Sequence, residues 1–321
     1  MTTLPESALD YDVVLLLGFG GPNGPDDIRP FLDRILKGRH IPHARYEAVV
    51  AHYMELGGRS PYNELTQRQA DGIARRLGDF GIDIPVEVAY RNAEPFIDMT
   101  MRRLAQNKAK NIFCIVLAPH QSAASWEKYV VSLENAREWI GPTAPRVDYV
   151  PPYFDHPLFV SAHAERVKHA LARLGRAELD TVEVIFTAHS IPQETAGSDM
   201  YVEQFYASAE LIAQAVGARS WSVGYQSRSG SPGERWLEPD IRDILRQLPG
   251  RGVREAVVAP IGFLCDHIEV LYDLDIDAKN VARDAGVRIE RAQALNDHPL
   301  FVQMLAELAI AGMRQGQAIQ V

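Results

Sequence analysis

Short apolar runs rich in β-branched residues alternate along this chain with longer amphipathic stretches. This alternation is typical of strands and helices in a parallel sheet, because each parallel strand needs a crossover helix before the next. The sequence therefore predicts an α/β fold. The expected strands are 13–17, 86–90, 112–117, 182–186, 221–225 and 256–260, and the expected helices include 65–77, 95–106, 156–174 and 201–215.

Two short segments occur twice in near-equal register. Asp-His-Pro-Leu-Phe-Val occupies 155–160 and again 297–302, and Val-Leu-Ala-Pro at 116–119 matches Val-Val-Ala-Pro at 257–260. One interpretation of the hexapeptide is local, since Asp-x-Pro is a good helix start, with the Asp as cap and the proline in the first turn. The agreement of the second pair favours duplicated halves. Two such halves would form a cleft where the carboxyl ends of their strands face each other, as ligands of open parallel sheets bind there.

Composition narrows the class of protein. No stretch approaches the roughly 20 apolar residues of a membrane-spanning helix, and the first residues are polar and acidic, so we expect a cytoplasmic enzyme. The net charge of −9 argues against a nucleic-acid partner. Cys114 and Cys265 both lie in apolar stretches, and two thiolates cannot supply the usual four ligands of an iron–sulfur cluster. We expect no tightly bound cofactor.

The segment Leu-Leu-Leu-Gly-Phe-Gly-Gly-Pro at 15–22 runs from a strand into a glycine-rich turn. It fails the dinucleotide-binding pattern, because Asn23 stands where the third glycine is needed and Pro22 removes a backbone donor. We interpret it as a tight turn that lets the backbone approach a flat ligand or the next helix.

Val-Ile-Phe-Thr-Ala-His-Ser-Ile-Pro at 184–192 delivers His189 at the end of a buried strand. A lone histidine there is more often held by a local hydrogen bond than chemically active. A chemical role for His189 gains support from the segment 260–277. There Glu269, Asp273 and Asp277 lie four residues apart along one stripe of an expected helix. A solvated acidic face is the alternative, but apolar neighbours favour a metal-handling row. Asp266 and His267 precede this helix and are candidate caps.

The segment 226–239, Gln-Ser-Arg-Ser-Gly-Ser-Pro-Gly-Glu-Arg-Trp-Leu-Glu-Pro, has the composition of a long loop anchored by Trp236 and Leu237. The sequence has no G-x-S-x-G elbow, P-loop or H-E-x-x-H motif. The usual hydrolase, kinase and zinc-protease assignments therefore have no support.

Together these segments resemble the ferrochelatase family, in order, from about Tyr11 to the end of the chain. The glycine-rich entry, the segment His-Tyr-Met-Glu-Leu-Gly-Gly-Arg-Ser-Pro-Tyr at 52–62, the His189 strand end, the 226–239 loop and the acidic helix all take part. The resemblance implies two Rossmann-like halves (chelatase-like fold), each with a four-stranded parallel sheet and with a porphyrin cleft between them. We expect the halves at 1–152 and 153–302, with a last helix at 303–321 packed back on the first half.

The same resemblance implies roles for individual residues. His189 would be the catalytic base and Glu269 its partner carboxylate, both also touching the metal, while Asp273 and Asp277 would deliver or hold metal. Residues expected to line the porphyrin or meet its propionates are Phe19, Ile35, Lys37, Arg39, Ser60, Arg91, Asn92 and Ser122.

The implied function is insertion of Fe²⁺, as substrate, into a porphyrin with release of two protons, in haem synthesis. Coproporphyrin III is favoured over protoporphyrin IX, because the entry segment and the Lys-Gly-Arg turn resemble that branch and no hydrophobic lip is visible. Many coproporphyrin enzymes carry an iron-binding tyrosine where this chain has Phe19, which offers no oxygen donor. A sirohydrochlorin-type chelatase and a non-catalytic porphyrin- or metal-binding protein are the alternatives. A haem-accepting protein is a further expected partner.

Overall fold

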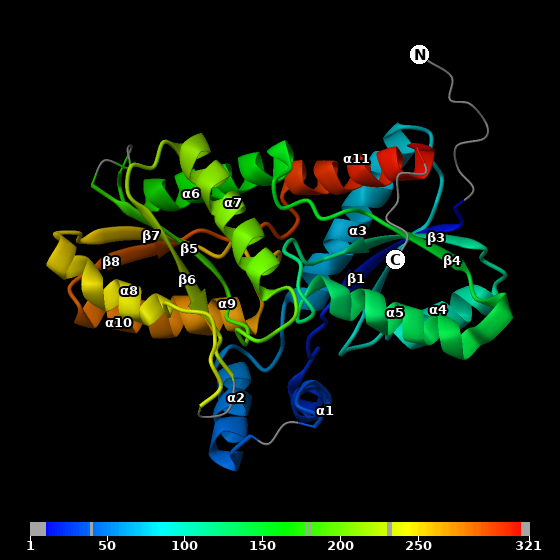
Figure 1. Ribbon diagram of the computed structural model, residues 1–321, viewed down its shortest axis with the longest axis horizontal. Helices are drawn as coiled ribbons and strands as arrows, with labels where there is room; N and C mark the ends of the chain where they lie inside the picture. The colour runs from blue at the N-terminus through cyan, green and yellow to red at the C-terminus, as the bar shows by residue number, and fades with distance from the viewer. Residues whose placement is uncertain (1–10, 39–40, 177–178, 180, 230–232, 316–321) are drawn as a thin grey trace.

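The computed structural model describes residues 11–38, 41–176, 179, 181–229 and 233–315. Two separate parallel sheets organise these residues (Figure 1). In the first sheet the strand order is β2-β1-β3-β4, and in the second it is β6-β5-β7-β8. The strands are β1 (Val13–Gly18), β2 (Val86–Tyr90), β3 (Asn111–Val116), β4 (Arg146–Tyr149), β5 (Glu183–His189), β6 (Trp221–Gln226), β7 (Glu255–Ala259) and β8 (Arg288–Arg291).

The two sheets have the same topology, which confirms the predicted duplication and the α/β fold with two four-stranded halves. The six expected strands are all present. β4 and β8 were not predicted, and both are four-residue edge strands that begin with an exposed arginine, Arg146 or Arg288. Such short, charged strands lack the apolar run that signals a buried strand.

The duplicated hexapeptide opens equivalent helices, α6 (Pro157–Arg173) and α11 (Pro299–Gln315). The expectation that Asp is the cap is wrong, because the imidazole Nδ1 of His156 accepts from the Leu158 amide at 3.2 Å, and His298 Nδ1 accepts from the Leu300 amide at 3.3 Å. The residue before the first-turn proline is the one whose side chain reaches the free amides of that turn.

Helices cover both faces of each sheet (Figure 1). Alternate residues of β1 point into two separate hydrophobic clusters, one with α3 and α11 and one with α4 and α5. The second sheet is packed likewise between α6 with α7 and α8 with α10. The bounds are α3 (Tyr62–Asp79), α4 (Ile97–Gln106), α5 (Trp126–Ile140), α7 (Ser198–Val216), α8 (Ile241–Gln247) and α10 (Lys279–Asp284), with 3₁₀ turns at Gly141–Thr143 and Leu248–Arg251.

The last helix joins the two halves. α11 packs on α3 and β3 of the first half and on α6 of the second. Gly312 allows this close approach, because a Cβ there would lie 2.2 Å from Cζ of Phe113. The helix begins at Pro299, four residues before the expected start, and its described part ends at Gln315. The expected boundaries of the two halves remain a prediction.

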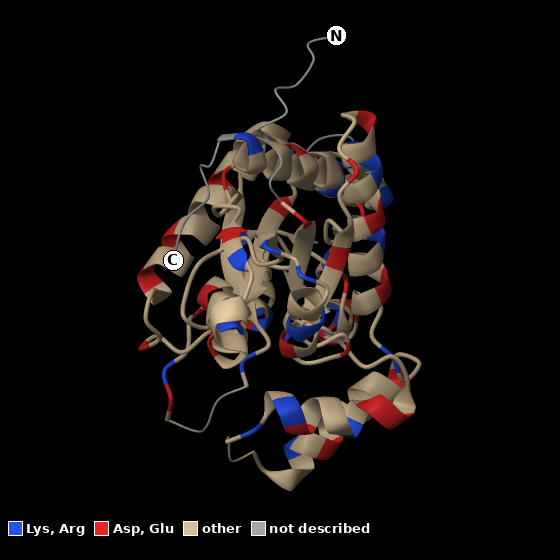
Figure 2. Cartoon of the chain, turned by 90° about the vertical axis from the view of Figure 1, so that its right-hand side faces the viewer, with Lys and Arg blue, Asp and Glu red and all other residues tan. Residues whose placement is uncertain are grey.

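Two helices that the sequence did not reveal, α1 (Pro25–Ile35) and α2 (His43–Glu55), form a hairpin set off from the sheets (Figure 2). Pro30 lies inside α1, and an internal proline normally argues against a helix. The hairpin has its own small core, in which Phe31 and Tyr53 pack with Ile268 from the second half. It therefore reaches across from the first half to the second.

Candidate active site

A cavity of about 690 Å³ lies between the two halves and the α1–α2 hairpin. It is within the usual size range of small-molecule sites. The carboxyl ends of strands from both sheets supply much of its wall, as the fold predicts. Phe19 follows β1, Arg91 follows β2 and Leu117 follows β3, while His189 and Gln226 are the last residues of β5 and β6.

His189 presents one ring nitrogen to this cavity. Its Nδ1 contacts the carbonyl oxygen of Ser190, and because a carbonyl only accepts, Nδ1 carries the proton and Nε2 is left as the basic nitrogen. The Tyr201 hydroxyl donates to the His189 carbonyl at 3.0 Å, which fixes the backbone at the strand end. The imidazole is thus held in the tautomer that a general base needs.

Glu269 faces His189 from the short helix α9 (Ile268–Tyr272). His189 Nε2 and Glu269 Oε2 are 3.8 Å apart, and the two side chains are 31% and 38% exposed. His267 is the N-cap of α9, accepting from the Glu269 amide at 3.3 Å, so the predicted capping role is confirmed. Asp266 instead pairs with Arg291 at 2.7 Å and is structural.

The three acids of the predicted stripe all line the cavity. After α9 the chain continues as a π-helix, Asp273–Ala278, whose wider turn still keeps residues four apart on one side. Burial raises the pKa of Asp273 to about 7, helped by the negative charges of Glu269 and Asp277 and opposed by a hydrogen bond from Ser227. Among the described residues, no three His, Cys, Asp or Glu side chains come close enough to hold a metal ion together. The acids form a row along the wall, and they do not form a closed chelating cluster.

The cavity wall also carries basic side chains. Arg34 donates from Nε to the Asn92 carbonyl at 2.9 Å, and the Arg91 guanidinium lies 5.5 Å from the centre of the Tyr129 ring. Arg45, on α2, donates to the Arg228 carbonyl at 2.6 Å and so ties the hairpin to the loop after β6. The hairpin contributes Arg34, Lys37 and Arg45 to the cavity, and the other basic residues come from other elements, among them Arg242, which pairs with Asp240 at 2.6 Å. The basic residues of the cavity are Arg34, Lys37, Arg45, Arg91, Lys128, Arg228 and Arg242.

The glycine-rich turn after β1 serves chain packing. Gly20 has φ of +84°, and a Cβ on Gly21 would lie 2.6 Å from Cβ of Ser60, so the turn approaches the segment that leads into α3. The turn therefore packs closely on another part of the first half, and approach of its backbone to a flat ligand stays a prediction. Phe19 in the same turn lines the cavity and packs edge-on against Phe31.

The sequence-predicted porphyrin residues divide into two groups. Phe19, Ile35, Lys37, Arg91 and Asn92 lie on the cavity wall, as do all four predicted catalytic and metal residues.

Ser60 and Ser122 do not lie on that wall. Ser60 is buried under the glycine turn and its hydroxyl accepts from the Tyr62 amide, while the Ser122 hydroxyl is occupied by Ser125 and the Ala124 amide. Both hydroxyls make hydrogen bonds within local turns, and their expected contact with porphyrin stays a prediction. Arg39 lies outside the described residues.

The sequence analysis did not identify several residues that line the cavity. Gln226 is the last residue of β6 and His120 follows β3, and a position at the end of a strand was the available signal. His52 and Tyr53 come from α2, whose pattern gave no helix prediction. Trp236 is 4% exposed, which confirms its predicted anchoring of the 226–239 loop.

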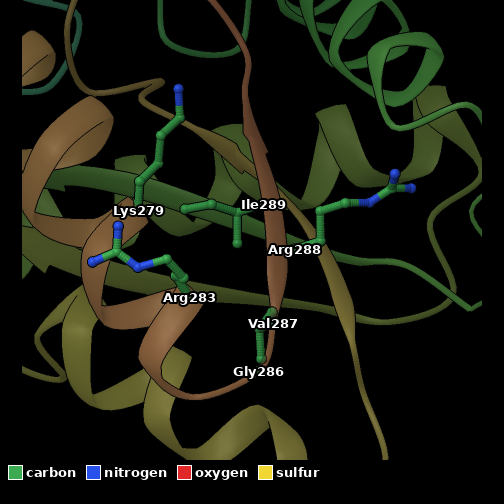
Figure 3. Close-up of a pocket in the computed structure, with 6 residues that line it drawn as sticks. All are labelled: Lys279, Arg283, Gly286, Val287, Arg288 and Ile289. Carbon is green, nitrogen blue, oxygen red and sulfur yellow. The ribbon is translucent and has the colours of Figure 1, made fainter.

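A second, more open hollow of about 430 Å³ lies where α10 meets β8 (Figure 3). Lys279 pairs with Asp275 at 3.3 Å, and Arg288 pairs with Glu255 at 2.6 Å. Figure 3 shows the Arg288 side chain pointing away from Lys279 and Arg283. The cations do not converge, so this hollow has no anion site.

The fold is shared with solved chelatases. SirB from Bacillus subtilis with Fe³⁺ aligns with a TM-score of 0.58 at 14% identity, covering 95% of this chain and 97% of that one. The sirohydrochlorin chelatase SirB from Bacillus subtilis subspecies spizizenii, in complex with cobalt, aligns with a TM-score of 0.55 at 13% identity, covering 95% and 96%. The chain therefore has the chelatase-like fold, and an imidazole and a carboxylate, His189 and Glu269, converge in its central cavity.

Sequence relatives narrow the class to one family. The coproporphyrin III ferrochelatase of Nocardia farcinica is 38% identical over 305 residues, covering 92% of this chain and 87% of the relative. The ferrochelatase of Rhodopirellula baltica is 38% identical over 309 residues, covering 96% and 87%. The family model described as Ferrochelatase matches residues 11–313, so this chain belongs to the ferrochelatase family. Within the described residues, no helix is long and apolar enough to span a bilayer.

Proposed function

We propose that this chain inserts Fe²⁺ into coproporphyrin III, with His189 and Glu269 as the catalytic pair. One observation carries the proposal: His189 Nε2 and Glu269 Oε2 face each other at 3.8 Å in the cavity between the halves. They come from different strands and helices far apart in sequence, as a site built by the duplicated fold requires.

Metallation must remove two pyrrole protons while the ion enters. Neutral His189 accepts the two protons one after the other at Nε2, because its Nδ1 proton is committed to the Ser190 carbonyl, and it releases each to solvent through its exposed side. The Glu269 carboxylate then stabilises the imidazolium across the short gap. Imidazole and carboxylate are also ligands that bind ferrous iron moderately, so the pair can pass the ion on. Asp273 and Asp277 would guide iron along the wall to this pair.

Two observations support coproporphyrin as the ring. The relative from Nocardia farcinica is named a coproporphyrin III ferrochelatase, and the cavity carries several arginines and lysines on its hairpin side. A ring with four propionates offers more carboxylates to these cations than protoporphyrin IX, which has two. Protoporphyrin IX remains the second candidate substrate.

We propose that no iron–sulfur cluster is bound, since Cys114 and Cys265 are both fully buried and lie in different hydrophobic clusters. Phe19 supplies no oxygen to the product iron, so the product iron would lack such a ligand or take another. A haem-accepting protein and a cytoplasmic location remain predictions.

An anaerobic insertion assay tests the main proposal. Wild type and His189→Ala are given ferrous iron with coproporphyrin III and, separately, with protoporphyrin IX. We expect fast insertion into coproporphyrin, slower insertion into protoporphyrin, and near-complete loss in the variant with porphyrin binding retained. Inactivity of wild type on both rings would refute the proposal.

A further inference from the structure

A third side chain, that of Gln226, connects the elements that carry His189 and Glu269. At 3.8 Å, His189 Nε2 and Glu269 Oε2 are beyond hydrogen-bond distance, so the two groups do not position each other. The helix that carries Glu269 spans only five residues and continues as a π-helix. A helix this short has little stability of its own, so contacts from outside must fix Glu269.

Gln226 makes those contacts. Its Nε2 donates to the Glu269 carbonyl at 2.8 Å, and its Oε1 accepts from the Thr187 hydroxyl at 2.8 Å. Thr187 is two residues before His189 on β5, and residues two apart lie on the same face of a strand. The planar Gln226 amide thus spans from the strand of the base to the helix of the carboxylate.

The amide itself is well fixed. Gln226 is 2% exposed and pairs with His189 in the β5–β6 register, and its carbonyl accepts from the Ser190 amide at 2.8 Å. Thr187 is fully buried. Buried hydrogen bonds with both partners satisfied are stiff and costly to break.

We propose that Gln226, oriented by Thr187, is a positioning residue that sets the distance between His189 and Glu269. This inference rests on the proposed function, because it concerns the same catalytic pair. Its consequence is that loss of the Thr187 hydroxyl loosens Glu269 and slows the chemical step, while the ring still binds. A misplacement of about 1 Å can cost up to roughly 100-fold in rate.

Thr187→Val is the decisive variant, because Thr187 does not line the cavity and Val keeps its branched shape. We expect kcat for iron insertion into coproporphyrin III to fall by roughly tenfold or more, while the KM for iron and porphyrin affinity by fluorescence quenching change less than about twofold. The matched control Thr187→Ser keeps the hydroxyl and should restore kcat to near wild type. An effect on KM alone, or a Ser variant as slow as the Val variant, would overturn the inference.

A double-mutant cycle tests whether Thr187 acts through Glu269. In a Glu269→Gln background, Thr187→Val should slow the residual reaction less than about twofold, because the group it positions is already impaired. An undiminished effect there would assign Thr187 a merely structural role.

Should Thr187→Val fail to fold, Gln226→Glu replaces it. The new carboxylate still accepts a hydrogen bond from Thr187 but cannot donate one to the Glu269 carbonyl. An unchanged kcat in this variant would refute the inference. An inactive wild type removes the proposed function and this inference together, whereas an active wild type with an unaffected Thr187→Val removes this inference alone.

Discussion

The imidazole of His52, on α2, stacks on the ring of Tyr272, on α9, with the ring centres 3.5 Å apart and the planes 13° from parallel. This contact joins the hairpin of the first half to the acidic helix of the second. Burial lowers the pKa of His52, against the raising effect of Asp277 and Glu55, so the stacked ring is neutral near pH 7. Both rings also line the cavity.

Loss of this stack should weaken porphyrin binding. Aromatic pairs contribute about 0.5–1.5 kcal/mol, so His52→Ala should raise the porphyrin Kd by roughly 2- to 10-fold with little change in kcat. Fluorescence titration measures the Kd. His52→Phe keeps a stacking ring and should bind like wild type. Equal affinities for the Ala variant and wild type would show that the hairpin is held by its other contacts alone.

Asp273 should make stability depend on pH. Its pKa is raised to about 7 in the folded protein, against an ordinary value near 4, so the folded state binds the proton more tightly than the unfolded state. The free energy of unfolding therefore falls as the pH rises from about 4 to about 7, and it levels off above pH 7. Asp273→Asn lacks this titration, so its melting temperature relative to wild type should be higher at pH 8 than at pH 4. A constant difference across that range would contradict the raised pKa.

The outer acid of the row should affect iron supply. Asp277→Asn should raise the KM for ferrous iron several-fold at unchanged saturating kcat, because it lines the wall away from the catalytic pair. Asp284→Asn is the matched control, since Asp284 is exposed, at the end of α10, and absent from the cavity wall. Initial rates against iron concentration measure both. A wild-type KM in Asp277→Asn would assign this acid to the solvated surface.

Sequence patterns predicted the sheets better than the hairpin. Buried parallel strands are continuous apolar runs, and they were located within a few residues, whereas the edge strands β4 and β8 carry exposed charges that hide them. His189 and Glu269 were found because one ends a strand and the other belongs to an acidic stripe. Gln226, which contacts Thr187 and the Glu269 carbonyl, was not found, because a position at a strand end was its only signal and many residues share it. The local turns that engage the hydroxyls of Ser60 and Ser122 are visible only in three dimensions, and the contact of these residues with porphyrin stays a prediction.

Gly312→Ala tests how tightly the last helix is fitted to the first sheet. In an open helix position the change would stabilise by about 1 kcal/mol, because alanine is the better helix former. Here the added Cβ would lie 2.2 Å from Cζ of Phe113, whose ring is fully buried, and overpacking a core costs typically 1–3 kcal/mol. We expect the cost of overpacking to exceed the gain in helix propensity, so the variant should have a lower free energy of unfolding in urea. Phe113→Leu shortens the opposing side chain, and the double variant should lose less than the sum of the two single changes. Additive losses would mean that α11 shifts away from β3 and avoids the contact.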